Sequence, residues 1–281
     1  MNIKKILIFF YKKISYIYVL IFGRKKMQFI NNIILSLALN AKGYKNFGNF
    51  ADTGEKKFIQ LISKDLNFCI DIGANVGKYT QLLLHETNSE IISFEPLKEA
   101  FKELQKIEKE YPNRLKVFNY AIGDKNTNLE LNFSDEKSEK ATFSNDIDKL
   151  SFFDHEKSKK VMTDIMTLDS FFSGNSSLIN TSNIDLIKID TEGFELEVIK
   201  GAKETIENKR PKYIQLEFNW HQLFKNHSMY KFSQYLVNYE LFQILPFGEK
   251  LIKVEASRPE TNIFHLSNFV YIRKDISREF S

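Results

Sequence analysis

Apolar segments of strand length alternate with amphipathic segments of helix length from Asn67 to the end of the chain. Five such apolar segments come first: Phe68–Asp71, Ile91–Glu95, Leu115–Ala121, Ile184–Asp190 and Tyr213–Phe218. Two more follow near the C-terminus, Leu241–Leu245 and Asn268–Arg273. This alternation is typical of a parallel sheet with helices on both faces. We therefore predict an α/β fold with a mostly parallel, seven-stranded sheet that ends in a C-terminal antiparallel hairpin.

Residues 1–50 form a separate extension in this interpretation, and residues 51–281 form the domain. Asp52 and Glu55 give a capping signal that predicts a helix to about Leu66. Thr167 is a second capping residue, for a short helix over Leu168–Phe172. The polar stretch Ser134–Lys160 predicts an excursion from the core rather than a part of it.

The extension is apolar and basic. Residues 1–51 contain nine Lys or Arg and no acid, whereas the remainder has 31 basic against 36 acidic residues. This asymmetry argues against a uniformly basic nucleic-acid binder. Lys12 and Lys13 interrupt the apolar run, and each would cost roughly 2.5 to 3.5 kcal/mol at a bilayer centre, so a spanning helix is disfavoured. Two interpretations stay open: residues 1–45 lie on an anionic membrane as an interfacial helix, or they pack on protein.

Composition restricts the remaining possibilities. A chain of 281 residues with 43% hydrophobic content can bury a large core. Cys69 is the single cysteine, which excludes an internal disulfide and a cysteine metal cluster. We expect a cytoplasmic protein, with the inner face of the membrane as the alternative location.

A glycine-containing turn follows the first predicted strand. Gly73 and Gly77 allow close backbone approach to a ligand, but the dinucleotide fingerprint would need glycine where Asn75 and Lys78 stand. Asp71 at the strand end suits a ligand with an ammonium group, such as the methionyl part of S-adenosylmethionine (SAM). Glu95 ends the next strand, where a carboxylate can accept both hydroxyls of a ribose.

The fourth and fifth strands end in further candidates for chemistry. Asp190 is expected at the site edge, while Glu192 either joins the site or caps the helix that starts near Phe194. Glu217 and His221 can face the same cleft, where a carboxylate or an imidazole is a suitable general base. The spacing of these four residues demands no metal, so we predict none.

Lys188 lies inside an apolar strand, so we expect it to pair with a carboxylate and orient Asp190 or Glu192. Glu195 is expected on a solvated helical face.

The segment Ile184–Ala202, which reads IDLIKIDTEGFELEVIKGA, resembles the FkbM family of SAM-dependent methyltransferases. The same family pattern is found in five further segments: the 71–77 turn, Phe94–Pro96, Ala121–Asp124, Thr167–Asp169 and Pro211–Glu217. The resemblance implies a Rossmann-like class I methyltransferase fold that uses SAM. It also implies O-methylation of a sugar or other natural-product hydroxyl.

The resemblance further assigns roles to the cofactor-binding positions. Asp71, Gly73, Asn75 and Gly77 would hold the methionyl end of SAM. Glu95 would bind the ribose, and Ala121 would border the adenine. Asp190, Glu192, Glu217 and His221 are the catalytic candidates that we carry forward.

Two other function classes compete with this interpretation. One is an NAD(P)-dependent oxidoreductase or nucleotide-sugar enzyme on a similar sheet, which Asn75 disfavours. The other is a non-catalytic scaffold that keeps the fold, which the presence of both Asp71 and Glu95 disfavours. We expect a small-molecule or glycan acceptor as partner, and no nucleic acid.

Overall fold

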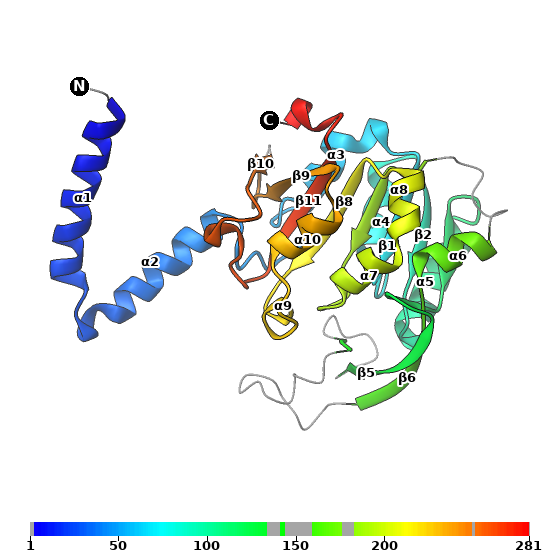
Figure 1. Cartoon of the computed structure of the whole chain (residues 1–281). Helices are drawn as coiled ribbons and strands as arrows, with labels where there is room; N and C mark the ends of the chain where they lie inside the picture. Colours follow the sequence, from blue (N-terminus) through cyan, green and yellow to red (C-terminus); the bar gives the residue numbers. More distant parts are fainter. Residues whose placement is uncertain (1–2, 134–140, 144–158, 176–182, 249–250, 281) are drawn as a thin grey trace.

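The computed structural model describes residues 3–133, 141–143, 159–175, 183–248 and 251–280 (Figure 1). Its α-helices are α1 (Ile3–Phe22), α2 (Gln28–Ala41), α3 (Glu55–Ile62), α4 (Lys78–Glu86), α5 (Lys98–Glu110), α6 (Leu168–Gly174), α7 (Glu195–Gly201), α8 (Lys203–Lys209), α9 (His221–Phe224) and α10 (Met229–Tyr235). Its strands are β1 (Phe68–Ile72), β2 (Glu90–Phe94), β3 (Leu115–Phe118), β4 (Ala121–Ile122), β5 (Thr127–Phe133), β6 (Lys159–Met166), β7 (Leu186–Ile189), β8 (Tyr213–Phe218), β9 (Tyr239–Ile244), β10 (Leu251–Lys253) and β11 (Ser267–Arg273).

The central sheet of the described chain has eight strands in the order β10-β9-β11-β8-β7-β1-β2-β3. The block from β8 to β3 is parallel, as predicted, whereas β11 pairs antiparallel with both β8 and β9. The prediction of seven strands with a plain C-terminal hairpin is therefore wrong in detail. β11 inserts between β8 and β9, and the short β10 adds an eighth strand at the edge.

Side chains of the parallel strands alternate between two hydrophobic layers. In β1, Phe68, Ile70 and Ile72 pack with α6, α7 and α10, whereas Cys69 packs with α3, α4 and α5. Because a strand has a period of two, every second position must face the same layer. Both faces are thus covered by helices, which explains the nearly continuous apolar runs that the sequence shows.

The third predicted strand, Leu115–Ala121, is divided in two. β3 ends at Phe118, and the Asn119 side chain donates hydrogen bonds to the carbonyls of Glu95 and Pro96. Ala121 then starts β4, which belongs to a second, three-stranded sheet in the order β4-β6-β5. This second sheet was not predicted from the sequence, and most of the excursion over 134–160 lies outside the described residues.

The two predicted capping residues have different outcomes. Thr167 caps α6, since its hydroxyl accepts a hydrogen bond from the Ser170 amide at 3.0 Å. Asp52 does not cap α3; Gly54 takes that position with φ of +86°, and its hypothetical Cβ would stand 2.1 Å from the Leu245 carbonyl oxygen. The chain therefore enters α3 through a turn that only glycine accommodates, and the helix ends at Ile62.

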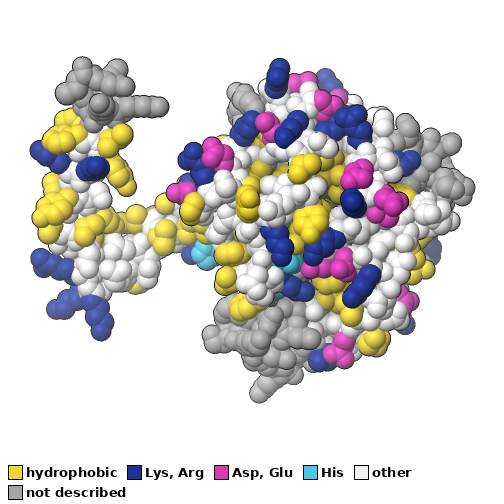
Figure 2. Space-filling view, viewed as in Figure 1, with side chains coloured by type: hydrophobic (Ala, Val, Ile, Leu, Met, Phe, Trp, Pro, Cys, Tyr) yellow, Lys and Arg dark blue, Asp and Glu magenta, His cyan; other side chains and the backbone are white. Residues whose placement is uncertain are grey.

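The N-terminal helices α1 and α2 extend away from the domain as an arm (Figure 1). Buried Leu39, near the end of α2, anchors the arm in the core. The space-filling view shows hydrophobic and basic side chains along the arm (Figure 2). No helix within the described residues has both the length and the apolar character needed to cross a membrane. The division into an extension over 1–50 and a domain over 51–281 stays a prediction.

We expect Gly201→Ala to destabilise the fold, because a Cβ at this last residue of α7 would stand 1.8 Å from the Gly123 carbonyl oxygen. Overpacking against rigid backbone should cost about 1 to 3 kcal/mol of unfolding free energy, measured as a lower urea midpoint. Gly174→Ala at the end of α6 is the matched control, since a Cβ there meets nothing within 4 Å. Equal midpoints for the two variants would contradict the close packing of α7 on the β4 turn.

Candidate functional site

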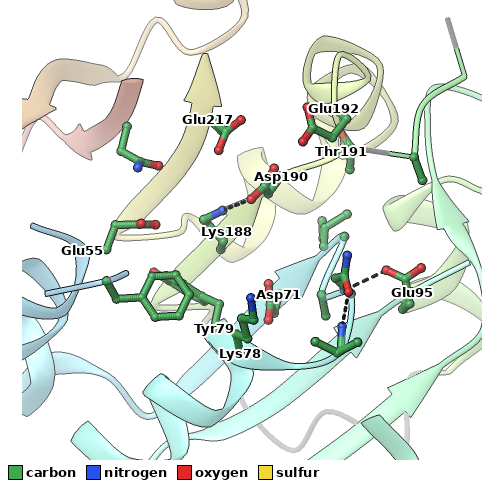
Figure 3. A pocket seen from close by; sticks show the side chains of 18 of the residues that line it. Glu55, Asp71, Lys78, Tyr79, Glu95, Lys188, Asp190, Thr191, Glu192 and Glu217 are labelled. Carbon is green, nitrogen blue, oxygen red and sulfur yellow. Dashed lines mark hydrogen bonds and ion pairs between the residues drawn. The ribbon is translucent and has the colours of Figure 1, made fainter. Parts of the chain in front are cut away.

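A cavity of about 630 Å³ opens at the carboxyl ends of the parallel strands (Figure 3). This is the edge at which ligands bind in open α/β sheets. Its volume suits a cofactor together with a small acceptor. The charged side chains that line it are Glu55, Asp71, Lys78, Glu95, Lys188, Asp190, Glu192 and Glu217. Six carboxyl groups against two lysines make the cavity strongly acidic.

Two rows of residues, most of them polar, run across the parallel strands next to this cavity. Ser93, Asp71, Lys188 and Gln215 are in register on β2, β1, β7 and β8, so they form one row on the same face. Two residues further along each strand direction lie Glu95, Gly73, Asp190 and Glu217, which form the second row. Parallel pairing and the period of two therefore bring together acids that are far apart in the sequence.

The turn after β1 is closed by its own hydrogen bonds. The amides of Gly73 and Ala74 both donate to the Phe94 carbonyl, at 3.0 and 2.9 Å. The Asn75 amide donates to the Glu95 carboxylate at 2.8 Å, and the Asn75 side chain accepts from the Val76 amide. The Gly77 amide donates to the Ala74 carbonyl. Each amide from residue 73 to 77 thus has an acceptor within the protein.

The two glycines of the turn have different tasks. Gly73 has φ of +81°, and a Cβ there would stand 1.9 Å from the Asp190 carbonyl oxygen, so glycine lets the ends of β1 and β7 meet. Gly77 has φ of +87°, and its hypothetical Cβ would meet Leu104 and Ile107 of α5. Gly73 and Asn75 line the cavity, whereas Gly77 serves the packing of α4 on α5.

Asp71 and Glu95 are buried acids. Hydrogen-bond donors lower the pKa of each, but burial raises it by more. The Thr80 hydroxyl donates to Asp71 at 2.7 Å, yet burial raises the pKa of Asp71 to about 6. Glu95 accepts from the amides of Leu97 and Asn75, both at 2.8 Å, and burial raises its pKa to about 7. A cation or hydroxyl donors in the cavity would favour the charged forms of both groups.

Asp190, Glu192 and Glu217 converge at the opposite side of the cavity, where one carboxylate oxygen from each lies within 4.8 Å of the others. Asn219 bridges two of them, since its side-chain amide donates to Glu192 at 3.0 Å and to Glu217 at 2.8 Å. Burial and the neighbouring Asp190 raise the pKa values of Glu192 and Glu217 well above the ordinary range. Three carboxylate oxygens this close together could also hold a divalent cation. The spacing of these residues along the sequence did not indicate such a site.

Lys188 supplies the buried positive charge next to this group. Its Nζ lies 2.9 Å from Asp190 Oδ2 and 5.2 Å from the centre of the Tyr79 ring (Figure 3). Burial lowers the pKa of Lys188, but Asp190 and Glu55 outweigh it and raise the pKa overall. The predicted pairing of Lys188 with a carboxylate is confirmed, and its partner is Asp190.

His221 lies behind Glu192 rather than among the cavity-lining residues. Its side chain is 2% exposed, and Nε2 lies 3.1 Å from Glu192 Oε2. Burial lowers the pKa of His221 to about 4, so the contact at neutral pH is a hydrogen bond from a neutral ring rather than an ion pair. This placement suits a residue that positions Glu192.

Glu192 takes one of the two places that the sequence left open, whereas Glu195 is not where it was expected. Glu192 does not cap α7; its φ of +51° turns its side chain into the cavity, a left-handed conformation that is uncommon outside glycine. Glu195, expected on a solvated face, is buried and accepts hydrogen bonds from the amides of Thr191 and Gly193. Glu195 is therefore the residue that holds the 190–193 turn in shape.

Several lining residues were not identified from the sequence. Glu55 was assigned to helix capping, but it is buried, and its two carboxylate oxygens accept from Gln215 and Thr53 at 2.8 Å each. The segment 46–50, which was assigned from the sequence to the extension, and Asn268, which was assigned to an apolar strand, also line the cavity. Only the polar identity of Asn268 within an apolar strand signalled its position. Ala121 lines the cavity from β4, as a residue near the adenine would.

The chain is similar to solved structures of methyltransferases. Among solved structures, the chain is similar to precorrin-6y C5,15-methyltransferase from Geobacter metallireducens, with a TM-score of 0.39, 11% identity, and coverage of 78% of this chain and 88% of that chain. It is also similar to the METTL16 MTase domain (TM-score 0.43, 10% identity, 78% and 64% coverage). A third similar structure is P. horikoshii TYW2 in complex with MeSAdo, with a TM-score of 0.40, 12% identity, and coverage of 81% of this chain and 65% of that chain.

No curated protein sequence matches the chain. The family described as the Methyltransferase FkbM domain matches residues 71–243, from the end of β1 to β9. This match spans more than half of the chain and confirms the resemblance carried by the 184–202 segment. The protein therefore belongs to the FkbM family of methyltransferases.

Proposed function

We propose that this protein transfers a methyl group from SAM to a hydroxyl of a sugar, a surface glycan or a related small molecule. One observation carries the proposal. A single cavity joins the Asp71 and Glu95 side, which suits the cofactor, to the group of Asp190, Glu192 and Glu217, which suits a hydroxyl acceptor. The membership of the FkbM family supports the same reaction class.

The residues present fit SAM better than a dinucleotide. SAM carries a sulfonium and an ammonium group, and the cavity offers six carboxyl groups against two lysines. A pyrophosphate would instead require free backbone amides at the turn after β1. The amides of residues 73 to 77 already donate within the protein. Asp71 would face the methionyl part and Glu95 the ribose, while SAM supplies an activated methyl group to the site.

The protein must align the acceptor hydroxyl and remove its proton. Lys188 fixes the Asp190 carboxylate at 2.9 Å, so Asp190 can accept a hydrogen bond from the acceptor and orient its oxygen. Burial raises the pKa values of Glu217 and Glu192, which makes their ionised carboxylates stronger bases toward a hydroxyl proton. Asn219 and His221 hold these two carboxylates in position. The hydroxyl proton would pass to the carboxylate as the acceptor oxygen bonds the methyl carbon and the bond from that carbon to the sulfur of SAM breaks, which leaves S-adenosylhomocysteine.

A non-catalytic scaffold would have no use for this arrangement. Three like-charged groups within 4.8 Å repel one another and raise the free energy of the ligand-free fold. Such arrangements of perturbed pKa values in a cavity are typical of functional sites. The acid group at Asp190, Glu192 and Glu217 therefore supports an enzyme over a scaffold.

We expect Glu95→Gln to weaken SAM binding about 10- to 100-fold, because a hydrogen bond to a charged group is worth about 1.5 to 3 kcal/mol. The dissociation constant for SAM is measured by isothermal titration calorimetry. Asp190→Asn is the matched control at the other side of the cavity and should bind SAM as the unchanged protein does. With a panel of glycans, release of S-adenosylhomocysteine should be lost in Asp190→Asn. A folded protein that binds NAD(P) and not SAM would overturn the proposal.

We expect Glu217→Gln to stabilise the ligand-free protein increasingly as pH rises. The pKa of Glu217 is raised in the folded state, so the folded protein binds more protons than the unfolded chain above pH 4.5. This contribution to stability is complete below that pH and is lost as pH rises through the folded pKa. The difference in Tm between Glu217→Gln and the unchanged protein should thus be larger at pH 8 than at pH 5.

The control for this measurement is Glu90→Gln at the exposed first position of β2, whose Tm difference should change less between pH 5 and pH 8 than that of Glu217→Gln. A Tm difference for Glu217→Gln that stayed constant or shrank from pH 5 to pH 8 would show that Glu217 is not electrostatically strained.

A further inference from the structure

The first arm helix presents an exposed apolar face. Phe10, Ile14, Ile17 and Ile21 follow one another at spacings of four, three and four residues, which places them on one side of α1. Their exposed fractions are 56%, 66%, 55% and 52%. Soluble monomers rarely expose contiguous apolar surface of this kind, so it marks an interaction face.

The second arm helix has a matching face. Phe29, Ile33 and Leu37 are spaced by four residues along α2 and are exposed by 75%, 45% and 63%. The two helices contact each other at their junction, where the Tyr18 hydroxyl donates to the Asn31 side chain at 2.7 Å and Tyr18 stacks on Phe22. The arm is thus held together at its bend, and its apolar faces remain uncovered.

Basic side chains frame these faces. Lys12 lies on the side of α1 opposite to Ile14 and Ile21, and Lys13 lies at the flank with its Nζ 4.7 Å from the Phe9 ring. Arg24, Lys25 and Lys26 form an exposed basic turn between α1 and α2 (Figure 2). Residues 1–51 contain no acid. Other apolar residues of α1, among them Phe9 and Val19, are exposed as well. Exposed apolar side chains together with lysines, in a segment without acids, are the pattern of a helix that lies in a membrane interface.

We infer that the arm formed by α1 and α2 binds an anionic lipid surface. The apolar face of α1 enters the boundary of headgroups and acyl chains, and its lysines extend toward the headgroups. Lys12 and Lys13 lie at the middle of α1, where charged side chains would be costly inside a bilayer, so the proposed contact is interfacial. A second copy of the chain is a poorer occupant, since two arms packed together would bring seven basic residues each with no acid to pair them. This inference does not depend on the proposed reaction.

The test is co-sedimentation of the purified full-length protein with phosphatidylcholine vesicles that contain or lack phosphatidylglycerol. Ile14→Gln/Ile17→Gln removes the apolar face without changing charge and should lower the partition coefficient on the order of 100-fold. Tyr16→Gln, on the opposite side of α1, is the matched control and should bind as the unchanged protein does. Lys12→Gln/Lys13→Gln should lower binding to anionic vesicles about 25-fold, at about fivefold per lysine, and leave binding to neutral vesicles unchanged.

SAM titration and circular dichroism of each variant show that its domain is folded and its cofactor site intact. Full-length protein that stays in the supernatant with anionic vesicles would overturn the inference. So would a dimer, seen by light scattering, that dissociates in Ile14→Gln/Ile17→Gln, because a second copy would then cover the face. Loss of SAM binding with vesicle binding retained would contradict the proposed function alone.

Discussion

The buried Lys188 is the interaction on which the functional edge of the sheet depends. It lies in register with Asp71 on one neighbouring strand and Gln215 on the other, and its Nζ reaches Asp190 two residues along its own strand. A lysine buried to this degree is costly unless carboxylates surround it. The same carboxylates are costly to one another unless a cation lies among them. Lys188 and its ion-pair partner Asp190 therefore depend on each other, and neither of these two could be replaced singly at low cost to stability.

The ion pair between Lys188 and Asp190 is positioned by the close approach of the ends of β1 and β7. Gly73 permits contact between the turn after β1 and the backbone of Asp190, and Glu195 fixes the turn that follows by accepting its amides. Glu192 then takes a left-handed conformation that turns its carboxylate into the cavity. Backbone strain at a non-glycine residue is typical of functional sites. The turn is thus stabilised from behind by Glu195 so that Glu192 and Asp190 can face the ligand.

Much of this architecture could be predicted from the sequence, because it depends on local periodicity. The apolar runs located the strands of the central sheet, and the polar residues at their ends located Asp71, Glu95, Asp190 and Glu217. What failed depends on contacts between distant segments. Glu55 was interpreted as a capping residue, since nothing near it in sequence reveals that Gln215 would meet it. His221 was placed in the cleft, because four residues beyond a strand end does not specify a direction, and burial behind Glu192 is a tertiary result.

Basic residues are concentrated in the N-terminal segment, and acidic residues are in excess in the rest of the chain. Residues 1–51 carry nine basic residues without an acid, while the rest of the chain has more acids than bases and concentrates six carboxyl groups in one cavity. Near an anionic surface the arm is attracted and the domain is mildly repelled, within a Debye length of about 8 Å at physiological salt. The domain would then stay in water with its cavity open to solutes. The proposed membrane attachment and the proposed methyl transfer would then use separate surfaces, so that the apolar face needed for one would not compete with the polar cavity needed for the other.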